Sequence, residues 1–218
     1  MLRISDLNLS YPGYDPLATV SLEIKTGDQI ALLGRSGTGK STLLAAIING
    51  APEIERQTDK IAYIAQEPAL LPWATTIDNV LLGFRLRGET ITTEHQSEAQ
   101  RLLDEVELGH LSNRKTSLLS GGQKARVALA RVLIEDADLI LLDEPFSGLD
   151  RSTRIQMANL CQKLLVDKTL ILVTHDPRDA HNWLETAMVL TTESMTGPHA
   201  LDTFDDDQTL VQALDGTR

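Results

Sequence analysis

Short apolar runs bounded by turn residues alternate along this chain with longer stretches in which apolar residues recur every three or four positions. The first pattern predicts strands, and the second predicts helices. Strands are predicted at 2–9, 20–24, 29–33, 61–65, 139–142, 169–173 and 187–191, and helices at 41–48, 76–86, 93–106, 119–134 and 151–166. Strands followed by helices in this order indicate an α/β fold.

Two further segments are predicted from weaker signals. Asp176 as an N-cap with Pro177 at the first helical position predicts another helix start. Residues 193–218 contain three consecutive aspartates and little apolar pattern, so we expect a weakly structured acidic tail with a terminal helix near 209–214. No internal repeat is present, and a chain of 218 residues is expected to form one domain.

Composition narrows the classes of function. The net charge of −11 counts against a nucleic-acid surface, which needs a basic stripe. No apolar run is long enough to cross a bilayer and the first residues lack a signal-peptide pattern, so the protein is expected to stay where it is made. The single cysteine, Cys161, lies in an apolar helical pattern. We expect a core residue in a reducing compartment rather than a reactive thiol.

The segment Gly34-Arg35-Ser36-Gly37-Thr38-Gly39-Lys40-Ser41 matches the phosphate-loop pattern G-x-x-x-x-G-K-[ST] between a predicted strand and a predicted helix. Its glycines let successive N–H groups turn inward, and the helix start adds its positive dipole end. Lys40 is then expected to reach the β- and γ-phosphates. The hydroxyl of Ser41 is expected to ligate Mg²⁺, with Thr42 as a secondary candidate. A glycine-rich turn that merely carries a lysine is the alternative.

Asp143 and Glu144 follow the apolar run 139–142, and His175 follows the run 169–173. Ligands of open α/β sheets bind at the carboxyl ends of the strands, so we expect these side chains near the phosphate loop. Asp143 is expected to hold Mg²⁺, usually through water, and Glu144 to orient or deprotonate an attacking water. His175 could contact a γ-phosphate. The alternatives are a solvated acidic turn and a structural histidine.

Leu119-Ser120-Gly121-Gly122-Gln123 opens a predicted helix. Ser120 with Gln123 forms a capping box, which any helix can use. Two glycines in the first turn, however, lower helix stability, which indicates that something approaches the backbone closely. A helix start without side chains suits a phosphate group. Further along, Ser147-Gly148-Leu149-Asp150 predicts a turn and the cap of the next helix.

Two aromatic positions keep two interpretations each. Leu70-Leu71-Pro72-Trp73 is an apolar cluster in a proline-punctuated loop, so it is either folded under or offered to a partner. Tyr11 precedes Pro12-Gly13 in a turn. It either packs at a strand end or stacks on a flat base.

These motifs, together with Gln66, occur in one order and with one spacing, and they resemble the nucleotide-binding subunit of ABC transporters. The resemblance covers nearly the whole chain, and Leu-Ser-Gly-Gly-Gln is its most specific part. It implies a P-loop NTPase core with a mainly parallel sheet and an inserted helical subdomain at about 70–135. The antiparallel β-subdomain is expected to be reduced, because 51–60 is short. Arg35 replaces the frequent proline of the phosphate loop.

The resemblance also implies roles for individual residues. Tyr11 becomes the aromatic that stacks on adenine, and Gln66 the glutamine that contacts Mg²⁺ and the attacking water. Ser120 to Gln123 are expected to cap the γ-phosphate of a nucleotide held by the other subunit. Asp150 resembles the aspartate that crosses the dimer, and His175 the switch histidine.

The implied function is hydrolysis of ATP, with Mg²⁺, by a head-to-tail homodimer that powers a separate membrane permease. Leu70 to Trp73, with Thr76, Asn79 and Val80, further resemble importers of nitrate, sulfonate and taurine type. This implies a permease contact near Leu70–Trp73, a solute-binding protein outside the membrane, and a peripheral location on its cytoplasmic face. The alternative is a soluble ABC-type ATPase that acts on another protein or on nucleic acid, although the acidic charge disfavours nucleic acid. A phosphate-loop kinase is disfavoured by Glu144 and by the second glycine motif.

Overall fold

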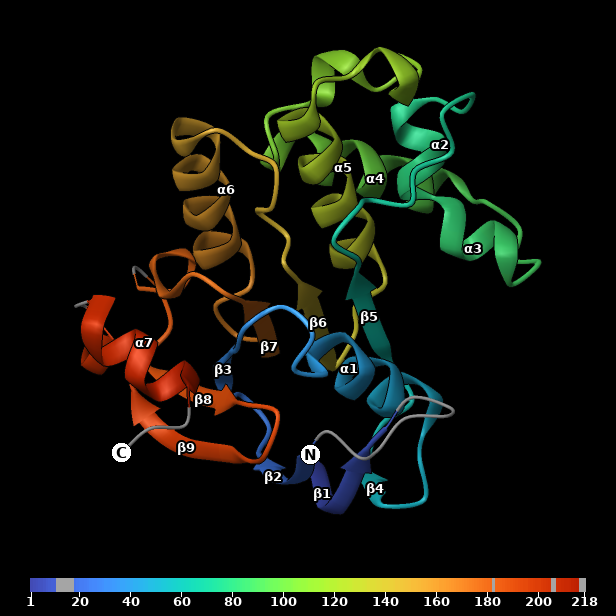
Figure 1. The fold of residues 1–218 in the computed structure, drawn as a ribbon. Coiled ribbons are helices and arrows are strands. Elements are labelled where there is room, and N and C mark those ends of the chain that lie inside the picture. The colour runs from blue at the N-terminus through green and yellow to red at the C-terminus, as the bar shows by residue number, and fades with distance from the viewer. Residues whose placement is uncertain (11–17, 182, 205–206, 216–218) are drawn as a thin grey trace. The chain divides into compact units, whose positions relative to one another are not determined.

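The computed structural model describes residues 1–10, 18–181, 183–204 and 207–215 of the chain. Its internal contacts define two compact units, which are described separately below (Figure 1). The sheet unit contains Met1–Ile61, Asp138–Glu144 and Asp167–Arg218, and the helical unit contains Ala62–Ala137 and Pro145–Val166.

A small antiparallel sheet forms the beginning of the sheet unit. In it, β1 (Leu2–Leu9) lies between β2 (Ala18–Ile24) and β4 (Ile54–Arg56). The predicted alternation of β1 holds on both sides of a shift in register between Ile4 and Leu7, where Asp6 has a φ of 53°. The short strand β4 was not predicted, because three residues carry too little pattern to be detected.

The larger sheet places the candidate motifs at its strand ends. Within the sheet unit its strands follow the order β6 (Leu139–Asp143), β7 (Thr169–Thr174), β3 (Gln29–Leu33), β8 (Thr186–Leu190) and β9 (Met195–Ala200). The first four strands are parallel to one another. They are buried almost throughout, which explains their continuous apolar runs.

One core cluster joins both sheets to α1 (Lys40–Asn49). The helix contributes Leu43, Leu44 and Ile47 to it. The parallel strands add alternate residues, which include Ile30, Leu32, Leu139, Leu141, Ile171 and Val173. Because α1 begins at Lys40, within the phosphate-loop motif, its packing on this core holds that motif at the end of β3.

The last part of the chain has more regular structure than predicted. Instead of an irregular segment after β8, β9 pairs with β8 in antiparallel orientation. Its side chains are mostly exposed, so the sequence shows no apolar alternation there. A 3₁₀ turn at Leu201–Phe204 and the helix α7 (Asp207–Asp215) follow, and α7 occupies the place of the predicted terminal helix beside β8 (Figure 1).

The helical unit contains α2 (Thr76–Val80), α3 (Leu82–Leu86), α4 (Thr93–Glu105), α5 (Gly121–Ile134) and α6 (Arg151–Leu164). It also contains short 3₁₀ turns at Gly109–Leu111 and Thr116–Leu118, and β5 (Ile61–Ile64) begins at its boundary with the sheet unit. The single helix predicted at 76–86 is interrupted at Leu81.

The helix predicted from Asp176 and Pro177 is only a 3₁₀ turn, Pro177–Asp179, in the sheet unit. Asp176 does cap it, since its carboxylate accepts from the amide of Arg178 at 3.0 Å. The carboxylate of Asp179, however, turns back to accept from the hydroxyl of Thr174 at 2.6 Å. The predicted N-cap and first position are therefore confirmed, although the helix they begin is a single 3₁₀ turn.

A buried amide, Asn79, orders the apolar loop that precedes α2. Its Oδ1 accepts from the amide of Leu71 at 2.8 Å and from the guanidinium of Arg131 at 2.9 Å. Its Nδ2 donates to the carbonyls of Leu71 and Thr75, and Thr116 supplies a further hydroxyl bond to Leu71. Leu71 is therefore fixed by side chains from two places in the chain, Asn79 and Thr116, and Arg131 holds Asn79 in turn.

We expect Asn79→Ala to lower the free energy of unfolding by about 2–4 kcal/mol, because it leaves the part-buried guanidinium of Arg131 and the backbone of Leu71 short of partners. Urea unfolding measures this change. Asn113→Ala, at an exposed position outside a helix, is the control and should stay within about 0.5 kcal/mol of the parent. A similarly small effect of Asn79→Ala would contradict the structural role of the amide.

Candidate functional site

The phosphate-loop motif, residues 34–41, connects β3 to α1 in the arrangement that the sequence predicts. Gly39, the N-cap of α1, has a φ of 98°, in the left-handed region that glycine adopts without strain. Gly34 is required for another reason. A Cβ there would lie 2.6 Å from the carbonyl oxygen of Leu190 and 2.8 Å from Oγ1 of Thr38. The backbone can therefore curl only with these residues.

Lys40 lies inside that curl. Its Nζ donates to the carbonyls of Gly34 at 2.8 Å and Arg35 at 2.9 Å, and it lies 3.8 Å from Oε1 of Glu144. Burial lowers the pKa of Lys40, and the carboxylates of Glu144 and Asp143 partly offset this effect. An ammonium group is thus held between backbone carbonyls and two carboxylates. The hydroxyl of Thr38 also donates to the Arg35 carbonyl, at 3.0 Å.

Glu144 has an unusual backbone conformation for a residue with a side chain. Its φ of 46° lies in the left-handed region, which costs of order 1–3 kcal/mol and occurs preferentially at functional sites. Its amide donates to the carbonyl of Val173 at 2.9 Å. Its side chain is 14% exposed, and its Oε2 lies 3.2 Å from Nδ1 of His175, whose side chain is 52% exposed. The structure therefore brings Lys40, Glu144 and His175 together.

The backbone beyond His175 is fixed by Thr174, which the sequence did not single out. Its hydroxyl is fully buried, accepts from the amide of Asp176 at 3.0 Å and donates to Asp179. Because the Thr174 hydroxyl makes both bonds, it sets the direction of the turn after β7. His175 is then exposed to solvent on one side and lies beside Glu144 on the other. Only the threonine and two aspartates around the histidine hinted at this contact in the sequence.

The other predicted magnesium and nucleotide residues of the sheet unit lie around the same motif. Asp143 is buried at the end of β6, Ser41 is exposed in the first turn of α1, and Thr42 is partly buried beside it. Arg35 and Ser36 are exposed. Mg²⁺ prefers oxygen ligands and is commonly bound by one or two carboxylates together with phosphates and water. A hydroxyl and a carboxylate fit that requirement, although the described residues contain no group of three acidic, histidine or cysteine side chains that could hold a metal.

In the helical unit, Ser120 is the N-cap of α5. Its hydroxyl accepts from the amide of Gln123 at 3.3 Å, and Oε1 of Gln123 accepts from the amide of Ser120 at 3.0 Å. The two glycines differ in their surroundings. A Cβ on Gly122 would lie 2.5 Å from Cγ2 of Thr153, whereas a Cβ on Gly121 would meet only Leu149, at 3.8 Å. For Gly122 the close neighbour is therefore the chain's own threonine, and only Gly121 is open.

Asp150 and Gln66 also belong to the helical unit. Asp150 is the N-cap of α6, and its Oδ1 accepts from the amides of Ser152 at 3.0 Å and Thr153 at 3.1 Å. Hydrogen bonds from the hydroxyls of Ser152 and Thr153 lower the pKa of Asp150 well below its ordinary value. The side-chain amide of Gln66, through its Nε2, donates to the hydroxyl of Ser147 at 3.5 Å. Tyr11 lies outside the described residues.

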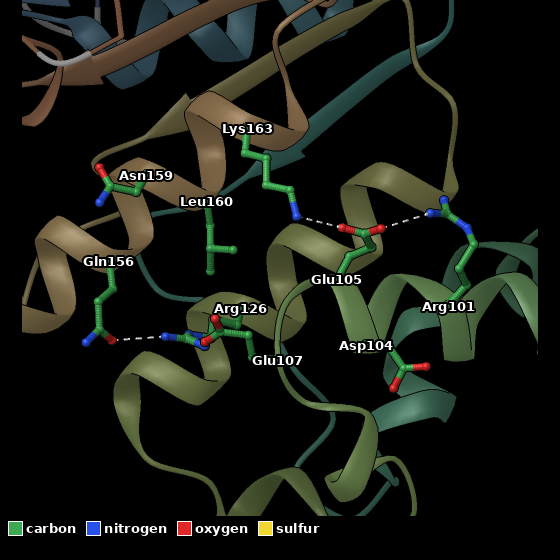
Figure 2. A pocket seen from close by; sticks show the side chains of 9 residues that line it. All are labelled: Arg101, Asp104, Glu105, Glu107, Arg126, Gln156, Asn159, Leu160 and Lys163. Carbon is green, nitrogen blue, oxygen red and sulfur yellow. Dashed lines mark hydrogen bonds and ion pairs between the residues drawn. The ribbon is translucent and has the colours of Figure 1, made fainter.

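A hollow of about 700 Å³ in the helical unit lies between α4, α5 and α6 (Figure 2). Most of its charged groups pair with other residues that line it. Lys163 and Arg101 both point at Glu105, at 3.2 and 3.6 Å, and Arg126 binds Glu107 and Gln156. The contacts of Lys163 with Glu105 and of Arg126 with Gln156 join helices that are far apart in the sequence, which is why no local pattern predicted the hollow.

Cys161 is excluded from the site. It is buried in α6, and this burial raises the pKa of its thiol to about 12. The thiolate form is therefore scarce at neutral pH, as expected for the core residue that the sequence indicates.

A phosphate loop between a parallel strand and a helix, with a buried lysine and carboxylates at neighbouring strand ends, defines a P-loop nucleotide-binding protein. Residues 17–147 match the family model described as ABC transporter. The chain belongs to the ABC transporter family and is similar to its ATP-binding proteins. The predicted P-loop NTPase fold is confirmed. No helix among the described residues is long and apolar enough to cross a membrane.

Individual relatives are similar over most of the chain. An uncharacterized ABC transporter ATP-binding protein of Haemophilus influenzae is 41% identical over 188 residues, which cover 83% of this chain and 78% of the relative. An aliphatic sulfonates import ATP-binding protein of Mesorhizobium japonicum is 36% identical over 210 residues, covering 93% and 82%. A dimeric ATP-binding cassette in a post-hydrolysis state, bound to ADP and Pi, is 28% identical with a TM-score of 0.79, covering 92% and 99%.

The backbone of Glu144 gives a test of stability. Glu144→Gly should be about 0.5–1 kcal/mol more stable than Glu144→Ala, because relief of left-handed strain exceeds the larger entropy loss of glycine. The order should reverse at the exposed Asn159 of α6, where glycine is about 1 kcal/mol less favourable than alanine. Urea unfolding of the four variants measures both differences. A Glu144→Gly protein less stable than Glu144→Ala would be inconsistent with the left-handed conformation.

Proposed function

We propose that this ATPase binds Mg²⁺-ATP at the phosphate loop, closes as a head-to-tail homodimer around two nucleotides and thereby drives a separate membrane permease. The observation that carries the proposal is the cluster of Lys40, Glu144 and His175 at adjoining strand ends beside the phosphate loop. Phosphoryl transfer needs positioned charges more than covalent catalysis, and this cluster supplies a cation, a carboxylate and an imidazole within a few ångströms.

Each side chain of the site has one proposed role toward Mg²⁺-ATP. The loop N–H groups of residues 34–41 and the ammonium of Lys40 hold the β- and γ-phosphates. The carboxylate of Glu144 orients or deprotonates the attacking water, and His175 contacts the γ-phosphate. Ser41, Asp143 and Gln66 are the proposed Mg²⁺ ligands, and the ion, when bound, neutralises charge on the phosphate oxygens. Tyr11 is proposed to stack on adenine.

The proposed second half of each site comes from another copy of the chain. Ser120 and the open Gly121 present a helix start that favours an anion. In this proposal the phosphate loop holds its nucleotide and leaves the outer side of the γ-phosphate uncovered. The dimeric cassette with ADP and Pi among similar structures supports this pairing. Asp150, whose carboxylate caps α6, is proposed to bring its turn to the dimer interface.

The proposed transport role is import. Relatives named as aliphatic sulfonate importers support a system of that type, with a permease and an external solute-binding protein, and a position on the cytoplasmic face of the membrane. Trp73 is 70% exposed and Leu118 is 62% exposed, and backbone bonds from Thr116 and Ser117 to Ala74 and Pro72 bring their segments together. Two exposed apolar side chains from a cross-bonded loop suit a hydrophobic partner near Leu70–Trp73 and favour a permease over a soluble target.

Glu144→Gln tests the chemistry and the dimer together. This variant should bind ATP as tightly as the parent, form a dimer in the presence of ATP and lose about 10²-fold or more of the hydrolysis rate, because the amide cannot take a proton from water. Nucleotide binding, sedimentation and phosphate release measure these properties. Hydrolysis at the parent rate would contradict the role of Glu144.

Two matched variants on the Glu144→Gln background separate ATP binding by the phosphate loop from dimerisation through Ser120. Lys40→Ala should lose tight ATP binding, because it removes the charge directed at the phosphates. Ser120→Arg should keep ATP binding by the monomer but lose ATP-driven dimerisation, since the arginine fills the space of the γ-phosphate. Normal dimerisation of Ser120→Arg would rule out the composite site while leaving ATP binding by the phosphate loop intact.

Trp73→Ala tests the permease contact. It should retain basal hydrolysis and lose co-purification with the permease. Leu86→Ala is the control, because Leu86 is equally apolar, lies exposed on α3 and is outside the proposed contact. Equal loss of basal hydrolysis in Trp73→Ala would indicate a purely structural tryptophan, and unchanged co-purification would place the permease elsewhere.

A further inference from the structure

The first turns of α5 and α6 meet at a single close contact inside the helical unit. Gly122 lies in the first turn of α5, and Thr153 lies in the first turn of α6. The 2.5 Å separation between an added Cβ on Gly122 and Cγ2 of Thr153 is shorter than carbon atoms tolerate. A side chain on residue 122 therefore cannot be accommodated unless Thr153 or one of the helices moves.

Thr153 is not free to turn away. Its Oγ1 donates to Oδ2 of Asp150 at 2.7 Å, and its amide donates to Oδ1 at 3.1 Å. Threonine has few χ1 rotamers in a helix, and the hydroxyl bond to Asp150 selects the one that directs Cγ2 at Gly122. Asp150 therefore holds the hydroxyl of this side chain, and Gly122 lies against its methyl group.

Further contacts join α6 to its neighbouring helices. One turn beyond Thr153, Oε1 of Gln156 accepts from the guanidinium of Arg126 of α5 at 3.0 Å. Near the end of α6, Lys163 bonds to Glu105 of α4 at 3.2 Å (Figure 2). The three contacts lie along the length of α6, and two of them, at Thr153 and Gln156, join its start to α5.

We infer that Thr153 is a positioning residue that fixes the start of α5, with its cap Ser120, relative to the turn that ends at Asp150, and that residue 122 is a glycine for this internal contact. Gly121 is then the glycine that stays open to a nucleotide. The inference rests on the proposed function in one respect, namely that both segments face the nucleotide of a second copy.

A steric rescue tests the inference on the full chain with Glu144→Gln. Gly122→Ala should weaken ATP-driven dimerisation about tenfold or more, because overpacking displaces α5 or breaks the bond to Asp150. Adding Thr153→Ser removes the clashing methyl and keeps the hydroxyl, so the double variant should return to within about threefold of Thr153→Ser alone. ATP binding by the monomer should remain unchanged in all of them, which separates positioning from nucleotide affinity.

Gly121→Ala is the matched control. Its Cβ has room within the chain and glycine is less favourable than alanine in a helix, so its free energy of unfolding in urea should equal or exceed that of the parent. Its loss of dimerisation should not be rescued by Thr153→Ser. If Gly122→Ala stays as impaired with Thr153→Ser as without it, residue 122 is glycine for the nucleotide and the inference is overturned. Equal rescue of Gly121→Ala would overturn it as well.

A second variant keeps the inference testable if Gly122→Ala does not fold. Thr153→Val keeps a methyl group toward Gly122 and loses the bond to Asp150, and it should weaken dimerisation about fivefold more than Thr153→Ser. Dimerisation equal to that of Thr153→Ser would overturn the role of Asp150 in orienting Thr153. Normal dimerisation of Ser120→Arg would instead refute the composite site, and the unfolding free energies of the glycine variants, measured on the monomer, would still decide the packing claim.

Discussion

An ammonium group kept largely out of water is the constraint on which the sheet unit depends. A buried charge is tolerated only with close partners, and Lys40 finds them in the carbonyls of Gly34 and Arg35 and in nearby carboxylates. Those carbonyls can converge only if the loop curls, and it curls only because residue 34 has no side chain and residue 39 takes a left-handed φ. The same charge then stabilises a carboxylate at the strained position 144.

The helical unit is organised by contacts between side chains and turns far apart in the sequence. Asn79 and Arg131 fix the loop at Leu71, and Thr153 fixes the start of α5 against α6. Each contact joins two segments. The resemblance relates one of them to a partner, and the other is a helix of the scaffold. The proposed partner contact and the proposed γ-phosphate cap at Ser120 therefore lie in the same compact unit.

The sequence predicted the features that have a local signal. The parallel strands appear as apolar runs because they are buried on both faces, and the phosphate loop is recognisable because its glycines occupy set positions. The strands β4 and β9 were missed, since one has three residues and the other exposes most of its side chains. The left-handed φ of Glu144 and the contact of Gly122 with Thr153 arise from tertiary packing, which no window of sequence contains. Gly122 was correctly identified as a closely approached backbone, but the approaching group was a side chain of the same protein.

The burial of Cys161 has a practical consequence for measuring motion. The chain contains one cysteine, and its thiol is both inaccessible and held in the unreactive protonated form. A cysteine introduced on the surface, for example at Asn113, would be the only thiol that a maleimide dye reaches in the folded protein. Fluorescence between two such labelled copies can then report their approach in real time, with the native sequence unchanged everywhere else.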